Sequence, residues 1–136
     1  VDSERLLRLI DGAAREEGKT LPVFLEVNVA GESSKFGLRP EAVGSVLDAA
    51  RELFRVRIVG LMTVPPVVAD PAEARPWFQA LRALRDRLQE ERGVELSELS
   101  MGMFADFETA IEEGATWIRL GSILLGSRPR REPVTE

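Results

Sequence analysis

The sequence predicts an α/β fold in which parallel strands alternate with helices. Three observations lead to this fold class. Segments with apolar residues at helical spacing alternate along the chain with short runs rich in β-branched residues. These runs are apolar on both faces, which is typical of strands in a parallel sheet. The connections between the segments are short enough for right-handed β–α–β units.

The first half of the chain is predicted to hold two helices and one strand. A helix is expected between Ser3, a candidate N-cap, and Gly18, a candidate stop. The β-branched run at 22–29 predicts a strand. After a polar loop, Pro40 suits the first turn of a second helix, whose apolar stripe ends at Phe54.

The same alternation repeats in the second half. Strands are expected at 56–62 and 97–101, with a long helix from about residue 76 to 92 between them. Gly93 is expected to end this helix, and a further helix is expected over 106–113.

The last predicted elements are a fourth strand at 117–120 and a short helix that ends at Gly126. We therefore expect residues 1–128 to form one folded unit and residues 129–136 to form a polar tail.

Composition excludes several classes of function. The 136 residues include no cysteine and no histidine, which excludes disulfides, thiol nucleophiles, zinc sites of the Cys/His type and Ser-His-Asp triads. A net charge of −5 argues against a nucleic-acid partner, whose binding face would be basic. No apolar run is long enough to cross a membrane, and residues 1–20 lack the pattern of a signal peptide. We expect a cytoplasmic protein with a small-molecule ligand.

Two architectures fit this order of elements: a doubly wound open sheet, or part of a (β/α)8 barrel. A whole barrel needs roughly 250 residues, about twice the length of this chain. Because the chain opens with Val1-Asp2-Ser3 directly before a helix, we expect it to be the second half of a larger fold.

The carboxyl ends of the last two predicted strands are the candidate ligand site, since ligands bind at these ends in both architectures. Gly121 allows close approach of a ligand to the backbone, and Ser122 offers a hydroxyl and an N–H at a helix start. Together with the glycine loop that precedes Met103, they resemble a barrel phosphate site. A Gly-Ser pair is also common as a plain N-cap.

Arg119 is unusual because it lies in an otherwise apolar predicted strand, with one residue between it and the loop that begins at Gly121. It could aim its guanidinium at a ligand in the mouth of a barrel. Equally, it could form a structural salt bridge, since a buried arginine is nearly always paired.

Several segments together resemble the pyridoxal phosphate homeostasis proteins (YggS/PROSC type), a family with a (β/α)8 barrel similar to the N-terminal domain of alanine racemase. The matching segments are Leu21–Val29, Gly31–Gly37, Gly60–Thr63, Leu99–Met103, Asp106–Phe107 and Ile118–Ser122. The resemblance runs from Val1 to about Arg128 and covers the C-terminal part of the family's barrel. It implies the C-terminal half of a (β/α)8 barrel.

The resemblance also implies a function and a set of binding residues. The family carries pyridoxal 5′-phosphate (PLP) as a regulator or carrier without established enzymatic turnover. The family's arginine that matches Arg119 meets the ring nitrogen, and the pair that matches Gly121 and Ser122 binds phosphate. The family's Schiff-base lysine lies in a part absent here, and neither Lys19 nor Lys35 matches it. The alternative is a fragment of a PLP-dependent amino-acid racemase, which would need a second base and an extra domain.

Arginine at the ring nitrogen suits a carrier or a restrained racemase better than a transaminase. Its pKa lies far above neutral pH, so it keeps its proton and the pyridine nitrogen stays unprotonated. An unprotonated ring is a weaker electron sink, which carbanion chemistry depends on.

One position departs from the family's pattern. The family has a serine that contacts phosphate where this chain has Phe104, directly after Met103. We expect the loss of that hydroxyl to remove a phosphate contact and a helix N-cap, the latter worth about 1 kcal/mol. The remaining contact from this loop would come from its backbone. Half a barrel also leaves two sheet edges unpaired, which favours self-association or pairing with the missing N-terminal half.

Overall fold

The computed structural model describes residues 1–33 and 35–127; the expected tail at 129–136 lies outside the described residues. Helices and strands alternate as the sequence predicts. The elements are α1 (Glu4–Glu16), β1 (Leu21–Glu26), η1 (Pro40–Ala42), α2 (Val43–Ala50), β2 (Val56–Met62), η2 (Pro71–Ala74), α3 (Arg75–Arg92), β3 (Glu98–Ser100), α4 (Phe107–Glu112) and α5 (Ser122–Leu125).

The three strands form one parallel sheet in the order β1-β2-β3. The strands expected at 56–62 and 97–101 are confirmed, the second in shortened form. The strand expected at 22–29 ends at Glu26, and Val27 then makes only an isolated parallel bridge to Leu38. The predicted parallel α/β fold class is therefore confirmed.

The predicted fourth strand at 117–120 is reduced to a single bridge, Trp117 with Ser100. A parallel ladder would continue from Arg119 N–H to the carbonyl of Met101. Instead, the Arg119 N–H donates to the carbonyl of Gly102 at 3.0 Å. Gly102 has φ +101°, so the chain turns there and the ladder ends.

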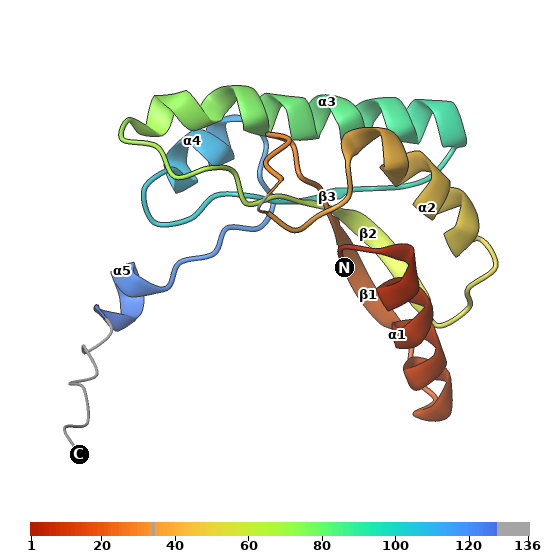
Figure 1. Cartoon of the computed structure of the whole chain (residues 1–136). Coiled ribbons are helices and arrows are strands. Elements are labelled where there is room, and N and C mark those ends of the chain that lie inside the picture. The colour runs from red at the N-terminus through yellow and green to blue at the C-terminus, as the bar shows by residue number, and fades with distance from the viewer. Residues whose placement is uncertain (34, 128–136) are drawn as a thin grey trace, which may run out of the picture.

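Helices cover one face of the sheet (Figure 1). Both α1 and α3 contact β2, and residues of α1, α2, α3 and α4 share one apolar cluster with the three strands. Leu7, Leu47 and Phe78 reach this cluster from the helices, and Leu25 and Leu61 reach it from the strands. A doubly wound sheet would have a core on each face. The single core therefore identifies part of a barrel, in which helices lie only on the outer face.

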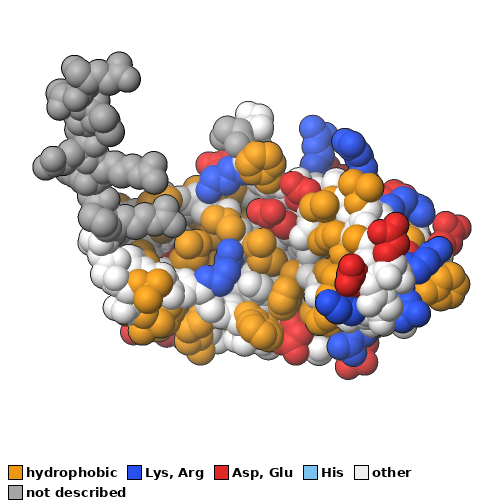
Figure 2. Space-filling view, turned by 90° about the horizontal axis from the view of Figure 1, so that it is seen from below, with side chains coloured by type: hydrophobic (Ala, Val, Ile, Leu, Met, Phe, Trp, Pro, Cys, Tyr) orange, Lys and Arg blue, Asp and Glu red, His pale blue; other side chains and the backbone are white. Residues whose placement is uncertain are grey.

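The opposite face of the sheet leaves hydrophobic side chains open. Figure 2 shows many of them across the lower face of the molecule. Phe24 and Trp117 stack edge to face with ring centroids 6.2 Å apart, and Trp117 remains 57% exposed. In a complete barrel this face would be the packed interior.

A β-bulge and a glycine bring β2 close to its neighbours. The register shifts between Val23 and Phe24, which pair with Ile58 and Gly60. A Cβ at Gly60 would lie 1.8 Å from the carbonyl oxygen of Glu98, so only glycine permits this approach of β2 to β3.

The outer edge of β1 is bonded by Val1 in the manner of a parallel strand. The Val1 ammonium donates to the carbonyl of Phe24 at 2.8 Å, and the Glu26 N–H donates to the Val1 carbonyl at 2.8 Å. Val1 therefore occupies part of the outer edge of β1.

A search of the described helices finds none that is both long and apolar enough to span a lipid bilayer.

Candidate functional site

The strands are parallel, so the loops after β1, β2 and β3 and the segment at 119–122 follow the carboxyl ends of the strands. We call this end of the sheet its carboxyl edge; it is the equivalent of a barrel mouth. The candidate residues Met103, Phe104, Arg119, Gly121 and Ser122 all lie in these connections.

Arg119 extends its side chain toward the end of β2. One terminal nitrogen, Nη2, donates to the carbonyl of Thr63 at 2.8 Å. The Nε atom is buried and has no partner among the described residues. Arg119 forms no salt bridge within the described part of the chain. The structural salt bridge considered from the sequence is therefore absent, and a carbonyl takes its place.

Two carboxylates act on Arg119 from nearby elements. Burial lowers the pKa of the Arg119 guanidinium from its ordinary value, while the charges of Glu26 and Asp106 raise it. The guanidinium remains protonated, because its ordinary pKa lies far above neutral pH. The edge thus combines one half-buried cation with two acids from β1 and from the start of α4.

Thr63, which the sequence analysis did not select, joins the strand ends around Arg119. Its hydroxyl donates to the Val27 carbonyl at 2.7 Å, and its N–H donates to the Ser100 carbonyl at 3.1 Å. The side chain is 1% exposed. The only available sequence signal was a β-branched polar residue directly after an apolar strand.

The loop after β3 turns at Gly102. A Cβ there would lie 2.6 Å from the Cβ of Ala110, so α4 can pack against the turn only when residue 102 is glycine. The next N–H, that of Met103, donates to Asp106 Oδ1 at 2.8 Å. This N–H is therefore engaged within the protein and is not available to a ligand in this conformation.

Phe104 does not occupy the N-cap, contrary to the sequence-based expectation. The helix α4 begins at Phe107 with Asp106 as its N-cap, so residue 104 lies in the preceding turn. The presence of phenylalanine instead of serine at position 104 therefore removes no helix N-cap in this fold. The Phe104 side chain is 60% exposed.

Gly121 and Ser122 lie at the start of the short helix α5, and both are exposed. Gly121 is the N-cap with φ −100°, and its carbonyl accepts from Leu124 and Leu125. No atom lies within 4 Å of a Cβ built at Gly121, so the approach to this backbone is open.

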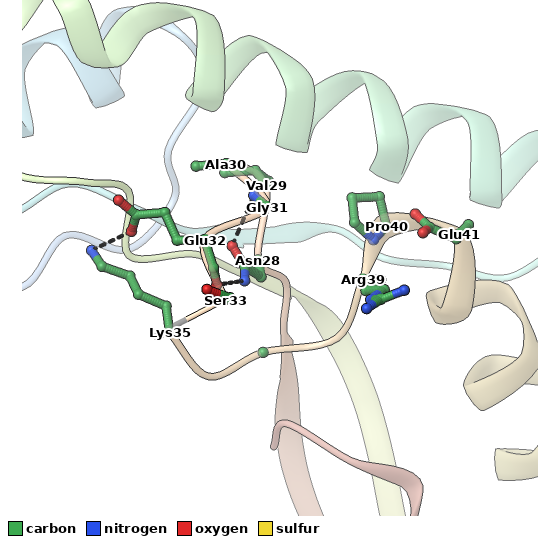
Figure 3. Close-up of a pocket in the computed structure, with 11 residues that line it drawn as sticks. Asn28, Val29, Ala30, Gly31, Glu32, Ser33, Lys35, Arg39, Pro40 and Glu41 are labelled. Atoms are coloured by element: carbon green, nitrogen blue, oxygen red, sulfur yellow. Dashed lines mark hydrogen bonds and ion pairs between the residues drawn. The ribbon is translucent and has the colours of Figure 1, made fainter.

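A cavity of about 590 Å³ lies in the loop after β1 (Figure 3). Asn28 shapes its wall, since its side chain donates to the Glu32 carbonyl at 2.8 Å and accepts from the Gly31 N–H at 3.1 Å. Lys35 is paired with Glu32 at 3.5 Å and donates to the Pro65 carbonyl at 3.2 Å. Lys35 is thus tied to the loop after β2 and is not a freely solvated charge.

A second, more apolar cavity of about 270 Å³ lies between the loops after β2 and β3. Val64, Pro65 and Val67 line it from one loop, and Met103 and Phe104 line it from the other. The ring of Phe104 therefore adds apolar surface to this cavity, at the position where the family resemblance implies a serine.

The described residues contain no cluster of three or more Asp, Glu, Cys or His side chains that could hold a metal ion. The other lysine, Lys19, is exposed in the turn before β1, at the amino end of the sheet, as expected.

These features define a class: a parallel part-barrel with a half-buried arginine at the carboxyl edge of its sheet. The family model "Alanine racemase, N-terminal domain" matches residues 1–129, and this chain belongs to that family.

Within the family, the similar curated proteins are pyridoxal phosphate homeostasis proteins. The protein of Aquifex aeolicus is 45% identical over 128 residues, which cover 94% of this chain and 56% of the relative. The protein of Mus musculus is 40% identical over 134 residues, covering 94% of this chain and 49% of the relative. The chain thus spans about half the length of these relatives.

Solved structures agree with this placement. PipY of Synechococcus elongatus without PLP has a TM-score of 0.86 and is 36% identical, covering 93% of this chain and 59% of PipY. PipY with PLP bound has a TM-score of 0.83 at 35% identity, covering 93% and 58%. An alanine racemase of Clostridium difficile shares the fold, with a TM-score of 0.75 at 17% identity, covering 96% and 36%.

Proposed function

We propose that this chain forms the pyridine- and phosphate-binding side of a PLP-binding barrel that acts in cytoplasmic PLP homeostasis. Two comparisons support the proposal: the relatives carry the name pyridoxal phosphate homeostasis protein, and PipY has been solved with PLP bound. The relatives are named for homeostasis and not for a reaction, which supports a carrier or regulator and not an enzyme.

The observation that carries the proposal is the buried, unpartnered Nε of Arg119. A buried donor without a partner is costly, and a ligand atom is one way to satisfy it. Arg119 is therefore assigned to the pyridine nitrogen, as the family resemblance implies. The residues at this edge fit the ring and phosphate of PLP.

Gly121 and Ser122 are assigned to the phosphate. Their backbone is exposed at the start of α5, and the Ser122 hydroxyl is exposed with it. Met103 and Phe104 are assigned to the wall of the site, because the Met103 N–H is engaged by Asp106 and Phe104 lines the apolar cavity.

When bound, PLP supplies an aldehyde and an electron-accepting pyridine ring. Arg119 holds its own proton and keeps the ring nitrogen unprotonated, which weakens that electron-accepting property. This arrangement suits a carrier or a restrained racemase, and the names of the relatives favour the carrier over the second candidate function, a racemase-like enzyme. We expect negligible turnover of amino acids.

Self-association is part of the proposal, since the open face of the sheet leaves hydrophobic side chains such as Trp117 exposed. Such a face can pack against a second copy or against a further part of the barrel.

Titration calorimetry of the chain with PLP and with inorganic phosphate tests the function. We expect Arg119→Ala to weaken PLP about ten-fold or more, since a hydrogen bond to a charged group is lost, and to change phosphate affinity far less. Phe104→Ser should tighten both ligands, because it adds a hydroxyl beside the phosphate. Arg57→Ala is the control, since it removes an exposed arginine near the start of β2.

Absence of PLP binding by the unmodified chain would contradict the proposed function. Equal losses of PLP and phosphate in Arg119→Ala would contradict the assignment of Arg119 to the pyridine ring.

A further inference from the structure

We propose that Thr63 is a positioning residue that holds the Arg119 guanidinium at the carboxyl edge of the sheet and thereby sets the affinity for a pyridine ring. The ring-binding part of this proposal rests on the proposed function. The positioning part rests on the geometry alone.

All three hydrogen-bonding groups of Thr63 are engaged, each by a different segment. The hydroxyl bonds to Val27 after β1, the N–H bonds to Ser100 in β3, and the carbonyl accepts from Arg119. The N–H and the hydroxyl hold the Cα of Thr63 between the end of β1 and β3, so the residue cannot shift without breaking a buried hydrogen bond. The place from which the Thr63 carbonyl meets Arg119 is therefore limited by β1 and β3.

That carbonyl is the hydrogen-bond partner that the described residues give to the Arg119 side chain. A free arginine side chain has many rotamers, and holding it in one of them costs conformational entropy. The guanidinium is planar, so a bond at Nη2 together with burial of Nε limits the orientation of the whole group. Thr63 thus supplies the constraint that keeps the buried Nε in place.

Arg119 has no alternative anchor in the described part of the chain. Glu26 and Asp106 act on it through their charges, but neither forms a salt bridge or a hydrogen bond with its side chain. If the Thr63 carbonyl moves, the guanidinium is expected to turn toward one of these carboxylates. A ring nitrogen would then have to compete with a carboxylate for the same donors.

Thr63→Val tests the proposal, because valine has the shape of threonine without the hydroxyl. It leaves the Val27 carbonyl without the Thr63 donor and removes one of the two hydrogen bonds that hold Thr63 in place. Thr63→Ser keeps the hydroxyl. Thr116→Val is the matched control, since the Thr116 hydroxyl also bonds to backbone groups, of Leu99 at 2.8 and 3.3 Å, but not to Arg119.

The first measurement needs no ligand. The Nε–Hε signal of Arg119 in a ¹H–¹⁵N spectrum is identified by its loss in Arg119→Lys. We expect Thr63→Val to shift or broaden this signal, and Thr63→Ser and Thr116→Val to leave it unchanged. An unchanged signal in a folded Thr63→Val protein would overturn the proposal. If Thr63→Val does not fold, a displaced signal in Thr63→Ser would overturn it instead.

The second measurement is a double-mutant cycle on PLP affinity. Thr63→Val should weaken PLP about three- to ten-fold, the factor for immobilising one flexible side chain anew, and leave inorganic phosphate within about two-fold. In the Arg119→Ala background, Thr63→Val should have no further effect on PLP. An equal loss in both backgrounds would show that Thr63 acts on the fold alone, and would overturn the proposal.

The two failures are distinguishable. If the unmodified chain binds no PLP, the proposed function and the ring-binding part are wrong, while the arginine signal still decides the positioning part. If the chain binds PLP and the cycle shows no coupling, only the role of Thr63 is wrong.

Discussion

Glu113 is a nearly buried carboxylate held by three side chains of α3. Arg75 Nη1 lies 2.7 Å from Glu113 Oε1, Arg82 Nη2 lies 3.4 Å from Oε2, and Gln79 donates to Oε1 at 3.2 Å. The hydrogen bond from Arg75 is the main reason that the pKa of Glu113 is lowered from its ordinary value of 4.5. This cluster ties the end of α4 to α3.

The lowered pKa of Glu113 predicts an acid-sensitive contribution to stability. Since the folded state binds the proton less readily than the unfolded state, the contribution is fully present above the unfolded pKa, near 4.5. It is lost as the pH falls through the lower folded value. We expect Glu113→Gln to flatten the fall in stability below about pH 4.5, measured by urea unfolding across this range.

Glu108→Gln is the control for this experiment. Glu108 lies on the same helix and forms no ion pair in the described part of the chain. The same flattening in Glu108→Gln would show that Glu113 has no special role.

Gly102 is the second residue on which a local feature depends. We expect Gly102→Ala to lower the free energy of unfolding by about 1–3 kcal/mol, since φ +101° is strained for alanine and the new methyl would meet Ala110. Gly121→Ala, with φ −100° and open space around its Cβ, should change stability by less than about 0.5 kcal/mol. Urea unfolding of both variants decides; similar losses would refute the role of the turn.

At the scale of elements, α3 anchors the helical layer to the sheet. Phe78, Leu81, Leu84 and Leu88 form its buried face, and Phe78 is 0% exposed.

We expect Phe78→Ala to destabilise the fold by about 3–5 kcal/mol, because it opens a cavity between α3 and β2. Phe54→Ala is the matched control, since Phe54 is 78% exposed, and its effect should stay within about 0.5 kcal/mol. Thermal or urea unfolding followed by circular dichroism measures both. An equal effect of the two substitutions would contradict the core assigned here.

The helices and the first three strands were predictable because their signals are local. Helical spacing, Gly93 and the β-branched runs each act within a few residues. The fourth strand was wrong because its ladder depends on the turn at Gly102, which the composition of 117–120 does not reveal. The N-cap expected at residue 104 was wrong for a related reason: the turn moves the helix start to Phe107.

The candidate site was predictable only in part. The rule that ligands bind at the carboxyl ends of parallel strands selected Arg119 and Gly121, and the structure has both in the connection that follows these ends. The bond from Arg119 to Thr63 spans 56 residues, and no pattern within a single segment can indicate such a contact. Whether these residues contact PLP remains a prediction.

For the whole molecule, we expect the open face of the sheet to control whether copies of the chain associate in solution. Large exposed apolar patches are typical of interaction surfaces. We expect the sedimentation coefficient of the chain to rise with protein concentration. Trp117→Arg should reduce this rise, because it places a charge on an exposed aromatic position. A constant monomer value for the unmodified chain over the micromolar range would contradict self-association.

The hydrogen bonds that Thr63 makes also bear on the order in which parts of the chain fold and open. They connect segments 36 and 56 residues apart, so the site can close only after the sheet and the last segment have come together. The segment at 117–127 is attached to the rest of the described chain by a few backbone bonds, whereas β2 is paired on both sides. In hydrogen exchange, the Arg119 amide should therefore exchange faster than those of β2, through openings that leave the sheet intact. We therefore expect the segment that carries Arg119 to assemble last during folding and to open first in the folded protein.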